Sequence, residues 1–148
     1  MGFGMSEIIR ILVVESEPVV ASLMTFLLTL IGYEVEAASN GKRGLELATA
    51  QRFDLILLAV DLPDINGFDL CRELKQRHIS YRTPIVLLSG NDHAERRAKA
   101  LELGAADFII KPFEVEDFLE RVERYTNGNQ SNVFEHADTP AQSLGSAA

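Results

Sequence analysis

Three apolar runs without alternating polar residues stand out along this chain. They are Ile8–Val14, in which Arg10 is the one polar residue, Leu55–Val60 and Ile85–Leu88. A strand with one face in solvent alternates apolar and polar residues, whereas a strand that is buried on both faces is apolar throughout. The runs therefore predict strands in the middle of a parallel sheet with helices on both faces.

Shorter strands are predicted at Glu34–Ala37 and Asp107–Ile110, each preceded by a glycine of the kind that ends helices, Gly32 and Gly104. Helix-length segments lie between the strands, at Pro18–Ile31, Gly41–Gln51, Gly67–Arg77, His93–Leu103 and Val115–Tyr125. Strand and helix alternate five times. This pattern predicts a flavodoxin-like (βα)5 fold: a doubly wound, parallel, five-stranded sheet in three α/β/α layers, with functional groups at the carboxyl ends of the strands.

The length of 148 residues suits one domain. We place that domain at residues 8–125, after an N-terminal extension of residues 1–7. From residue 126 to residue 148 the composition shifts to Asn, Gln, Ser, Gly and Ala, with few large apolar side chains. Such a composition is typical of a disordered tail or of a flexible linker in a longer protein, and the sequence leaves both open.

Composition limits the function. Asp and Glu outnumber Lys and Arg by 22 to 14, for a net charge of −8, and no dense basic cluster occurs. Binding to nucleic acid or to an anionic membrane needs such a cluster, so neither is expected. The single Cys71 forms no intramolecular disulfide, and Met1–Glu7 lacks the features of a signal peptide. The uncharged stretch Pro18–Tyr33 is too short to span a bilayer. We expect a cytoplasmic protein.

Four motifs in order give the chain a family resemblance. They are Ile11–Val14 leading into an acidic loop, Asp54–Leu58 leading into Leu62–Gly67, Pro84–Gly90, and Gly104–Phe113. Together, over Ile8 to Tyr125, the chain resembles the receiver domain of two-component response regulators. Each motif alone is weak, but the four in this order are specific.

The resemblance implies magnesium-dependent phosphoryl transfer from a histidine kinase to an aspartate at the end of the third strand. In the family the cation sits on two acidic residues after the first strand, on that aspartate, and on a backbone carbonyl two residues beyond it. The corresponding positions are Glu15, Ser16, Ala59 and Asp61. Hard oxygen ligands suit such a cation.

Two of these positions depart from the family pattern. The methyl group of Ala59 can neither attack phosphorus nor bind a metal, and Ser16 replaces a carboxylate with a neutral hydroxyl. We therefore expect Glu15, Ser16 and Asp61 to form at most a vestigial magnesium site, weak or empty. The chain is interpreted as a pseudo-receiver, not an enzyme, that acts by protein contact without phosphorylation. The alternative is a working phosphorelay receiver, in which Ala59 is an engineered substitution or Asp61 or Ser89 is a surrogate acceptor.

Other family positions are retained. The resemblance assigns Ser89 to the hydroxyl that follows the phosphoryl group, Phe108 to the aromatic switch, and Lys111 to the lysine before Pro112, whose preceding peptide bond the family holds cis. A partly buried lysine needs a counter-charge, so we expect Lys111 to pair with Glu15 or Asp61.

The helix predicted at Pro18–Ile31 carries no charge, and its apolar residues cover roughly 200° of its circumference, wider than the ~100° that a core-facing stripe needs. Two readings stay open: a deeply buried helix, or an apolar shoulder for a partner or a homodimer, with Met24 and Leu28 as test positions. The family adds a second contact surface, formed by the fourth helix, fifth strand and fifth helix. A histidine kinase is a possible partner.

A small-molecule enzyme or flavin binder on the same fold is a third alternative. Such a protein needs a phosphate-binding loop rich in Gly, Ser or Thr after its first strand. Glu15-Ser16-Glu17 stands there instead, so this alternative is disfavoured.

Overall fold

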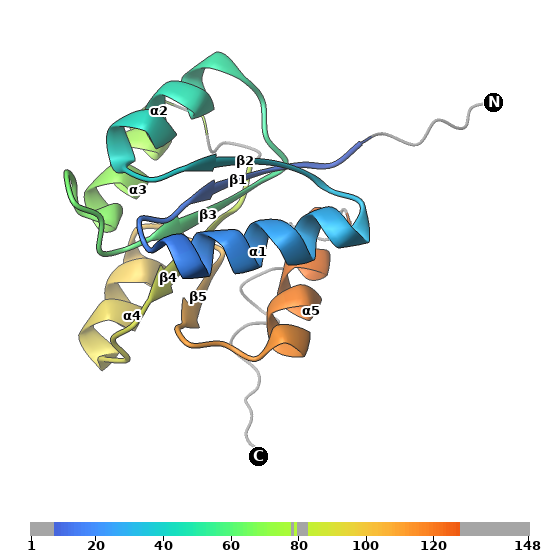
Figure 1. The fold of residues 1–148 in the computed structure, drawn as a ribbon. Coiled ribbons are helices and arrows are strands. Elements are labelled where there is room, and N and C mark those ends of the chain that lie inside the picture. Colours follow the sequence, from blue (N-terminus) through green and yellow to red (C-terminus); the bar gives the residue numbers. More distant parts are fainter. Residues whose placement is uncertain (1–7, 78, 80–82, 128–148) are drawn as a thin grey trace.

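The computed structural model describes residues 8–77, 79 and 83–127 (Figure 1). Strands and helices alternate from the first strand to the last helix. The order along the chain is β1 (Arg10–Val14), α1 (Pro18–Ile31), β2 (Glu34–Ala38), α2 (Gly41–Ala50), β3 (Leu55–Ala59), α3 (Gly67–Gln76), β4 (Ile85–Ser89), α4 (Ala94–Glu102), β5 (Asp107–Ile110) and α5 (Val115–Thr126). The predicted alternation is confirmed, and the boundaries differ by no more than two residues.

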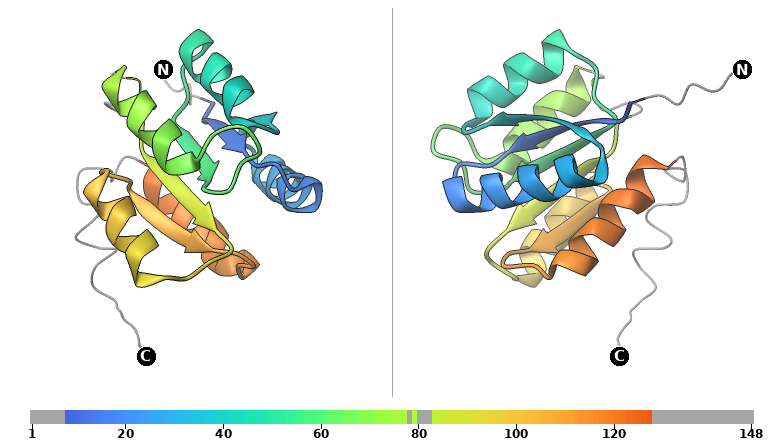
Figure 2. Two further views of the ribbon diagram at one scale, coloured as in Figure 1. Left: turned by 90° about the vertical axis from the view of Figure 1, so that its left-hand side faces the viewer. Right: turned by 45° about the vertical axis from the view of Figure 1, so that its right-hand side comes forward.

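All five strands are parallel and lie in the order β2-β1-β3-β4-β5. Helices α1 and α5 cover one face of the sheet, and α2, α3 and α4 cover the other (Figures 1 and 2). Strands β3 and β4 are buried at every residue, as their continuous apolar sequences predicted. The predicted three-layer, doubly wound fold is therefore correct.

Alternate residues of each central strand feed two separate apolar layers. Leu12 and Leu58 pack on the side of α2, α3 and α4, and Ile11 and Leu57 pack on the side of α1 and α5. Cys71 is fully buried in the first layer, as a small packing residue.

Helix α1 contributes Met24 and Leu28 to the second layer, and both are fully buried. Met24 and Leu28, the test positions of the apolar-shoulder reading, therefore lie on the buried side of the helix. They lie four residues apart, on the one stripe of α1 that faces the sheet.

The turns at the helix ends explain two polar residues. Asp64 accepts hydrogen bonds of 2.8 Å from the backbone N–H groups of Gly41 and Lys42, which hold the start of α2 and lower the pKa of the Asp64 carboxyl group. The predicted helix-ending glycines have positive φ values, 120° at Gly32 and 80° at Gly104.

Helix α5 continues through Thr126, one residue beyond the predicted domain end. The predicted extension, residues 1–7, and all but the first two residues of the predicted tail lie outside the described residues. Within the described part of the chain, no helix is both long and apolar enough to cross a membrane.

Candidate functional site

The carboxyl ends of the parallel strands bring the predicted site residues to one edge of the sheet. Glu15 follows β1, Ala59 ends β3, Ser89 ends β4, and Lys111 follows β5. Backbone hydrogen bonds continue the sheet beyond the strands. The Lys111 N–H donates to the Ser89 carbonyl at 2.7 Å, and the Val60 N–H donates to the Leu88 carbonyl at 2.8 Å. The sequence prediction that these loops meet is therefore correct.

Glu15 and Lys111 form a largely buried ion pair. The Nζ of Lys111 donates to Oε1 of Glu15 at 2.9 Å, and Oε1 of Glu17 lies 3.7 Å from the same nitrogen. The Glu15 side chain has no exposed surface and that of Lys111 is 11% exposed. Glu15 also accepts the backbone N–H of Glu17 through its other oxygen. The expected partner of Lys111 is therefore Glu15 and not Asp61.

We expect Glu15→Gln to destabilise the fold by about 3 kcal/mol, because breaking one side of a buried ion pair leaves the other charge uncompensated. Adding Lys111→Met should recover part of this loss, since both charges are then removed. Urea denaturation of the two single variants and the double variant measures the effect. A double variant that loses as much stability as the two single changes summed would contradict a coupled pair.

Ala59, the last residue of β3, contributes only a methyl group to this edge of the sheet. It is fully buried, and its carbonyl lies against Gly67 at the start of α3. The side chain offers no oxygen to a metal ion and no nucleophile to an electrophile. The Ala59 side chain therefore cannot accept a phosphoryl group or any other covalent group.

Asp61 is held by an arginine from α4. Both Asp61 carboxylate oxygens accept from Arg96, at 3.1 Å each, and a guanidinium nitrogen also donates to Oγ of Ser89 at 2.8 Å. Ser89 is buried, and its hydroxyl additionally exchanges hydrogen bonds with the backbone of Asn91. Sequence reasoning missed Arg96, because helix periodicity alone does not say which loops an exposed arginine reaches.

The residues at this edge do not fit a magnesium ion. Glu15 is engaged by Lys111 and Asp61 by Arg96, while Ser16 contributes only a neutral hydroxyl. A magnesium site is normally built on free carboxylate oxygens. Among the residues that the structure describes, no three His, Cys, Asp or Glu side chains are grouped to hold a metal.

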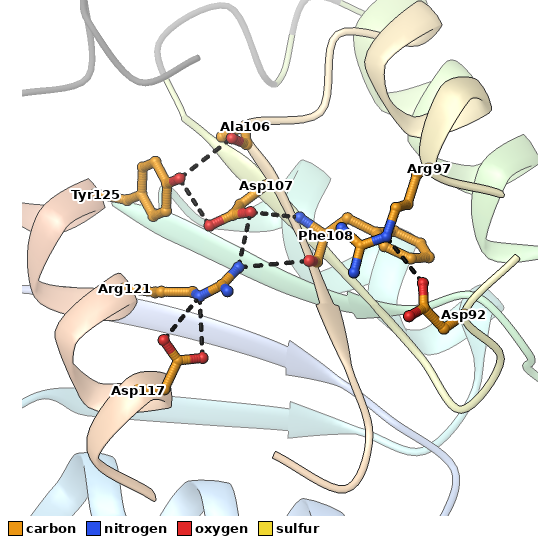
Figure 3. Close-up of polar contacts among 8 residues, drawn as sticks. All are labelled: Asp92, Arg97, Ala106, Asp107, Phe108, Asp117, Arg121 and Tyr125. Carbon is orange, nitrogen blue, oxygen red and sulfur yellow. Dashed lines mark hydrogen bonds and ion pairs between the residues drawn. The ribbon is translucent and has the colours of Figure 1, made fainter. Parts of the chain in front are cut away.

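The predicted switch residue Phe108 is buried in β5, and the Arg97 guanidinium lies 5.4 Å from the centre of its ring (Figure 3). Asp92 accepts from Arg97 at 2.8 Å and holds it there. The peptide bond between Lys111 and Pro112 is cis, as the resemblance implied.

A second polar cluster joins β5 to α5 and was not predicted (Figure 3). Asp107 accepts from Arg121 at 3.0 Å and from the Tyr125 hydroxyl at 2.8 Å, and Arg121 also pairs with Asp117. Burial and the neighbouring Asp107 charge raise the pKa of Tyr125. Burial opposes the charge on Arg121, but Asp107 and Asp117 outweigh it and raise the pKa of Arg121. The only sequence signal was an aspartate in an apolar strand.

Four large apolar side chains form an exposed stripe on α1, which we call the α1 apolar face: Val19, Leu23, Phe26 and Leu30. Three of them are more than 60% exposed. At 100° per residue the four lie within about 60° of one another, away from the buried Met24 and Leu28. The first two turns carry a shallow apolar groove lined by Pro18, Val19, Ser22, Leu23 and Phe26. Helix α1 is thus buried along the stripe of Met24 and Leu28 and exposed along the α1 apolar face, so each of the two readings describes one side of it.

Comparison with protein families matches residues 11–123 to the response regulator receiver domain. Among curated proteins, the chain is 42% identical over 113 residues to the transcriptional regulatory protein CusR of Escherichia coli K12 and 37% identical over 113 residues to the response regulator ArlR of Staphylococcus saprophyticus. These alignments cover 76% of this chain but only 49% and 50% of the relatives, so the chain spans about half their length.

Solved structures show the same fold. A CheY-like response regulator receiver domain protein from Methanospirillum hungatei superposes with a TM-score of 0.78 at 25% sequence identity, over 85% of this chain and 99% of that protein.

Proposed function

This chain belongs to the response regulator receiver domain family, and from that premise we propose that it is a signalling module which acts through protein contacts without being phosphorylated itself. The family's phosphoacceptor aspartate corresponds to Ala59 in this proposal, so the chain is a pseudo-receiver. A cytoplasmic location is part of the proposal and is supported by the unpaired, buried Cys71.

The proposal rests on one observation: among the described residues around Ala59, there is no nucleophile at the acceptor position and no unpaired carboxylate to hold a divalent cation. Each described carboxylate that flanks it is neutralised by a cation of the same chain, Glu15 by Lys111 and Asp61 by Arg96. A phosphoryl group would need a nucleophile and an open divalent-cation site. Asp61, the surrogate acceptor considered from the sequence, is held by both of its oxygens.

The test is incubation of the native chain with acetyl phosphate and Mg²⁺, followed by intact mass measurement. We expect no phosphoryl adduct, and beryllofluoride with Mg²⁺ should leave the NMR signals of Ser89 and Phe108 unchanged. An adduct that disappears in Asp61→Asn would overturn the proposal in favour of a working relay with a surrogate acceptor. An adduct that survives this substitution would overturn it as well.

We further propose that the α1 apolar face is the surface that contacts the partner. The other predicted surface, formed by α4, β5 and α5, is charged, and the two arginines nearest β5 are paired within the chain, Arg97 with Asp92 and Arg121 with Asp107. The α1 apolar face carries no charge and exposes four large apolar side chains side by side, as surfaces that bind another protein do.

The charges beside the α1 apolar face favour a partner over a second copy. Helix α5 lies next to α1, and the Tyr33 hydroxyl meets Thr126 at 3.2 Å where the two helices end (Figure 1). Glu116, Glu120 and Glu123 are exposed on one face of α5 and occur in none of the ion pairs among the described residues. Two copies meeting here would bring these acidic stripes together. We therefore propose a helical partner with an apolar face and a basic flank, such as a helix of a histidine kinase.

Substitution of Phe26 and Leu30, two strongly exposed residues of the α1 apolar face, tests whether this face binds the partner. We expect Phe26→Glu with Leu30→Glu to weaken binding to purified histidine kinase dimerisation domains at least tenfold while the fold is retained. Leu101→Glu is the matched control, because Leu101 is a half-exposed leucine on α4, on the other predicted surface. Binding is measured by isothermal titration calorimetry. Loss of binding in Leu101→Glu alone would move the contact to the α4, β5 and α5 surface, and dimerisation of the native chain that the double variant abolishes would identify a second copy as the occupant.

A further inference from the structure

Helix α4 buries fewer residues than any other helix among the described residues. Only Ala100 of its nine residues is buried, whereas α3 and α5 bury four or more residues each. A helix with so little buried apolar surface belongs to the low-stability part of a fold, and polar contacts decide where it lies. The polar contacts of α4 are therefore informative about what controls its position.

Arg96 makes the longest-range of these contacts. Its guanidinium group donates to both carboxylate oxygens of Asp61, 35 residues earlier in the chain, and to Ser89 at the end of β4. Such a bidentate contact fixes the orientation of the guanidinium group as well as its distance from the carboxylate. The first turn of α4 is thus tied to the loop after β3 and to the buried Ser89 hydroxyl.

The next residue, Arg97, anchors the same turn in a second direction. It lies over the Phe108 ring of β5 and pairs with Asp92 in the loop before α4 (Figure 3). Successive residues of a helix point about 100° apart, so two adjacent arginines can reach two different parts of the protein.

We propose that Arg96 and Arg97 form a two-point latch that holds α4, and that Arg96 makes the position of α4 depend on Asp61 and Ser89. Through the contacts of Arg96 with Asp61 and Ser89, the latch connects the edge of the sheet around Ala59 to the exposed helix α4. Any event that takes Asp61 or Ser89 away from Arg96 frees the first turn of α4. This inference concerns coupling within the chain, and it holds whether or not the chain is ever phosphorylated.

The latch can be opened because it is only partly buried. The Arg96 side chain is 24% exposed and that of Asp61 is 62% exposed, so water and salt reach the pair. The contact with Ser89 is shielded, since Ser89 is 1% exposed. Arg96 therefore combines one salt-sensitive contact with one protected contact.

Hydrogen exchange measured by NMR on the full chain tests the proposal. In Arg96→Ala we expect the backbone amides of Ala94–Glu102 to exchange roughly threefold to tenfold faster, with β3 and β4 unchanged. Asp61→Asn should act in the same direction, and the double variant should exchange no faster than Arg96→Ala. Raising the salt concentration should speed exchange in α4 of the native chain more than in α4 of Arg96→Ala, which keeps the exposed Arg97–Asp92 pair.

Arg72→Ala is the matched control, because Arg72 makes an exposed ion pair with Asp69 within α3 and reaches no other element. It should leave α4 exchange unchanged. Unchanged α4 exchange in both Arg96→Ala and Asp61→Asn would overturn the latch. Exchange that rises equally in α4 and in the central strands would overturn it too, since it would show a loss of overall stability and no local release.

Discussion

A chain that carries Ala59→Asp together with Ser16→Asp should bind Mg²⁺ and take a phosphoryl group from acetyl phosphate, whereas the native chain should do neither. The two substitutions add two unpaired carboxylates at the edge of the sheet, beside the native Glu15, which stays paired with Lys111. Hard carboxylate oxygens suit Mg²⁺, and the carboxylate introduced at position 59 supplies the nucleophile. Its oxygen attacks phosphorus and acetate leaves.

Without the metal, the single change Ala59→Asp should be unfavourable. Position 59 has no exposed surface, and Lys111 is already paired with Glu15, so the new carboxylate would be buried without a cation of its own. We expect Mg²⁺ to restore stability to the double variant by linkage, by about 2.7 kcal/mol at a hundredfold excess over its dissociation constant. The native chain should show no such dependence.

Intact mass after treatment with acetyl phosphate and thermal unfolding with and without Mg²⁺ measure the two effects. The variant with Ala59→Asn and Ser16→Asn is the control, because it has the same shape without the charges. A folded Ala59→Asp, Ser16→Asp chain that neither binds Mg²⁺ nor forms an adduct would show that more than two side chains separate this edge from a phosphorylation site. Arg96 would then be the next residue to remove, since it holds Asp61.

The fold could be predicted because the signals for it are local. Strands buried on both faces have continuous apolar sequences, as β3 and β4 do, and the glycines at positions 32 and 104 end helices where positive φ is required. The meeting of Glu15, Ser89 and Lys111 also followed, because the carboxyl ends of parallel strands share one edge of the sheet.

The side-chain contacts between elements could not be predicted in the same way. Periodicity shows that apolar residues cover more than half of the circumference of α1, but only the packing of α5 and the sheet decides that Leu28 is buried and Leu30 is exposed. The pairing of Asp61 with Arg96 depends on the path of two loops. The family resemblance, together with the need for a counter-charge, narrowed the partner of Lys111 to two carboxylates, and the geometry chose between them.

The second large effect concerns Gly67, where the loop after β3 turns into α3. A Cβ atom there would lie 2.2 Å from the carbonyl oxygen of Ala59 and 2.7 Å from Cα of Val60, and the Gly67 N–H donates to the Val60 carbonyl at 2.7 Å. Both clashing atoms are buried backbone atoms, at the last residue of β3 and at the residue that follows it, so neither can move aside as a flexible side chain would. The backbone of α3 passes this close to β3 only because residue 67 has no side chain.

We therefore expect Gly67→Ala to lower the free energy of unfolding by about 3 kcal/mol, the upper part of the usual range for overpacking. Gly90→Ala is the matched control, since nothing lies within 4 Å of a Cβ atom there, and it should change stability by less than about 0.5 kcal/mol. Urea denaturation compares the two. A Gly67→Ala chain as stable as Gly90→Ala would mean that α3 can move away from β3. In that case the loop that carries Asp61 is not fixed by the sheet, and the contacts of Asp61 with Arg96 would have to hold it in place.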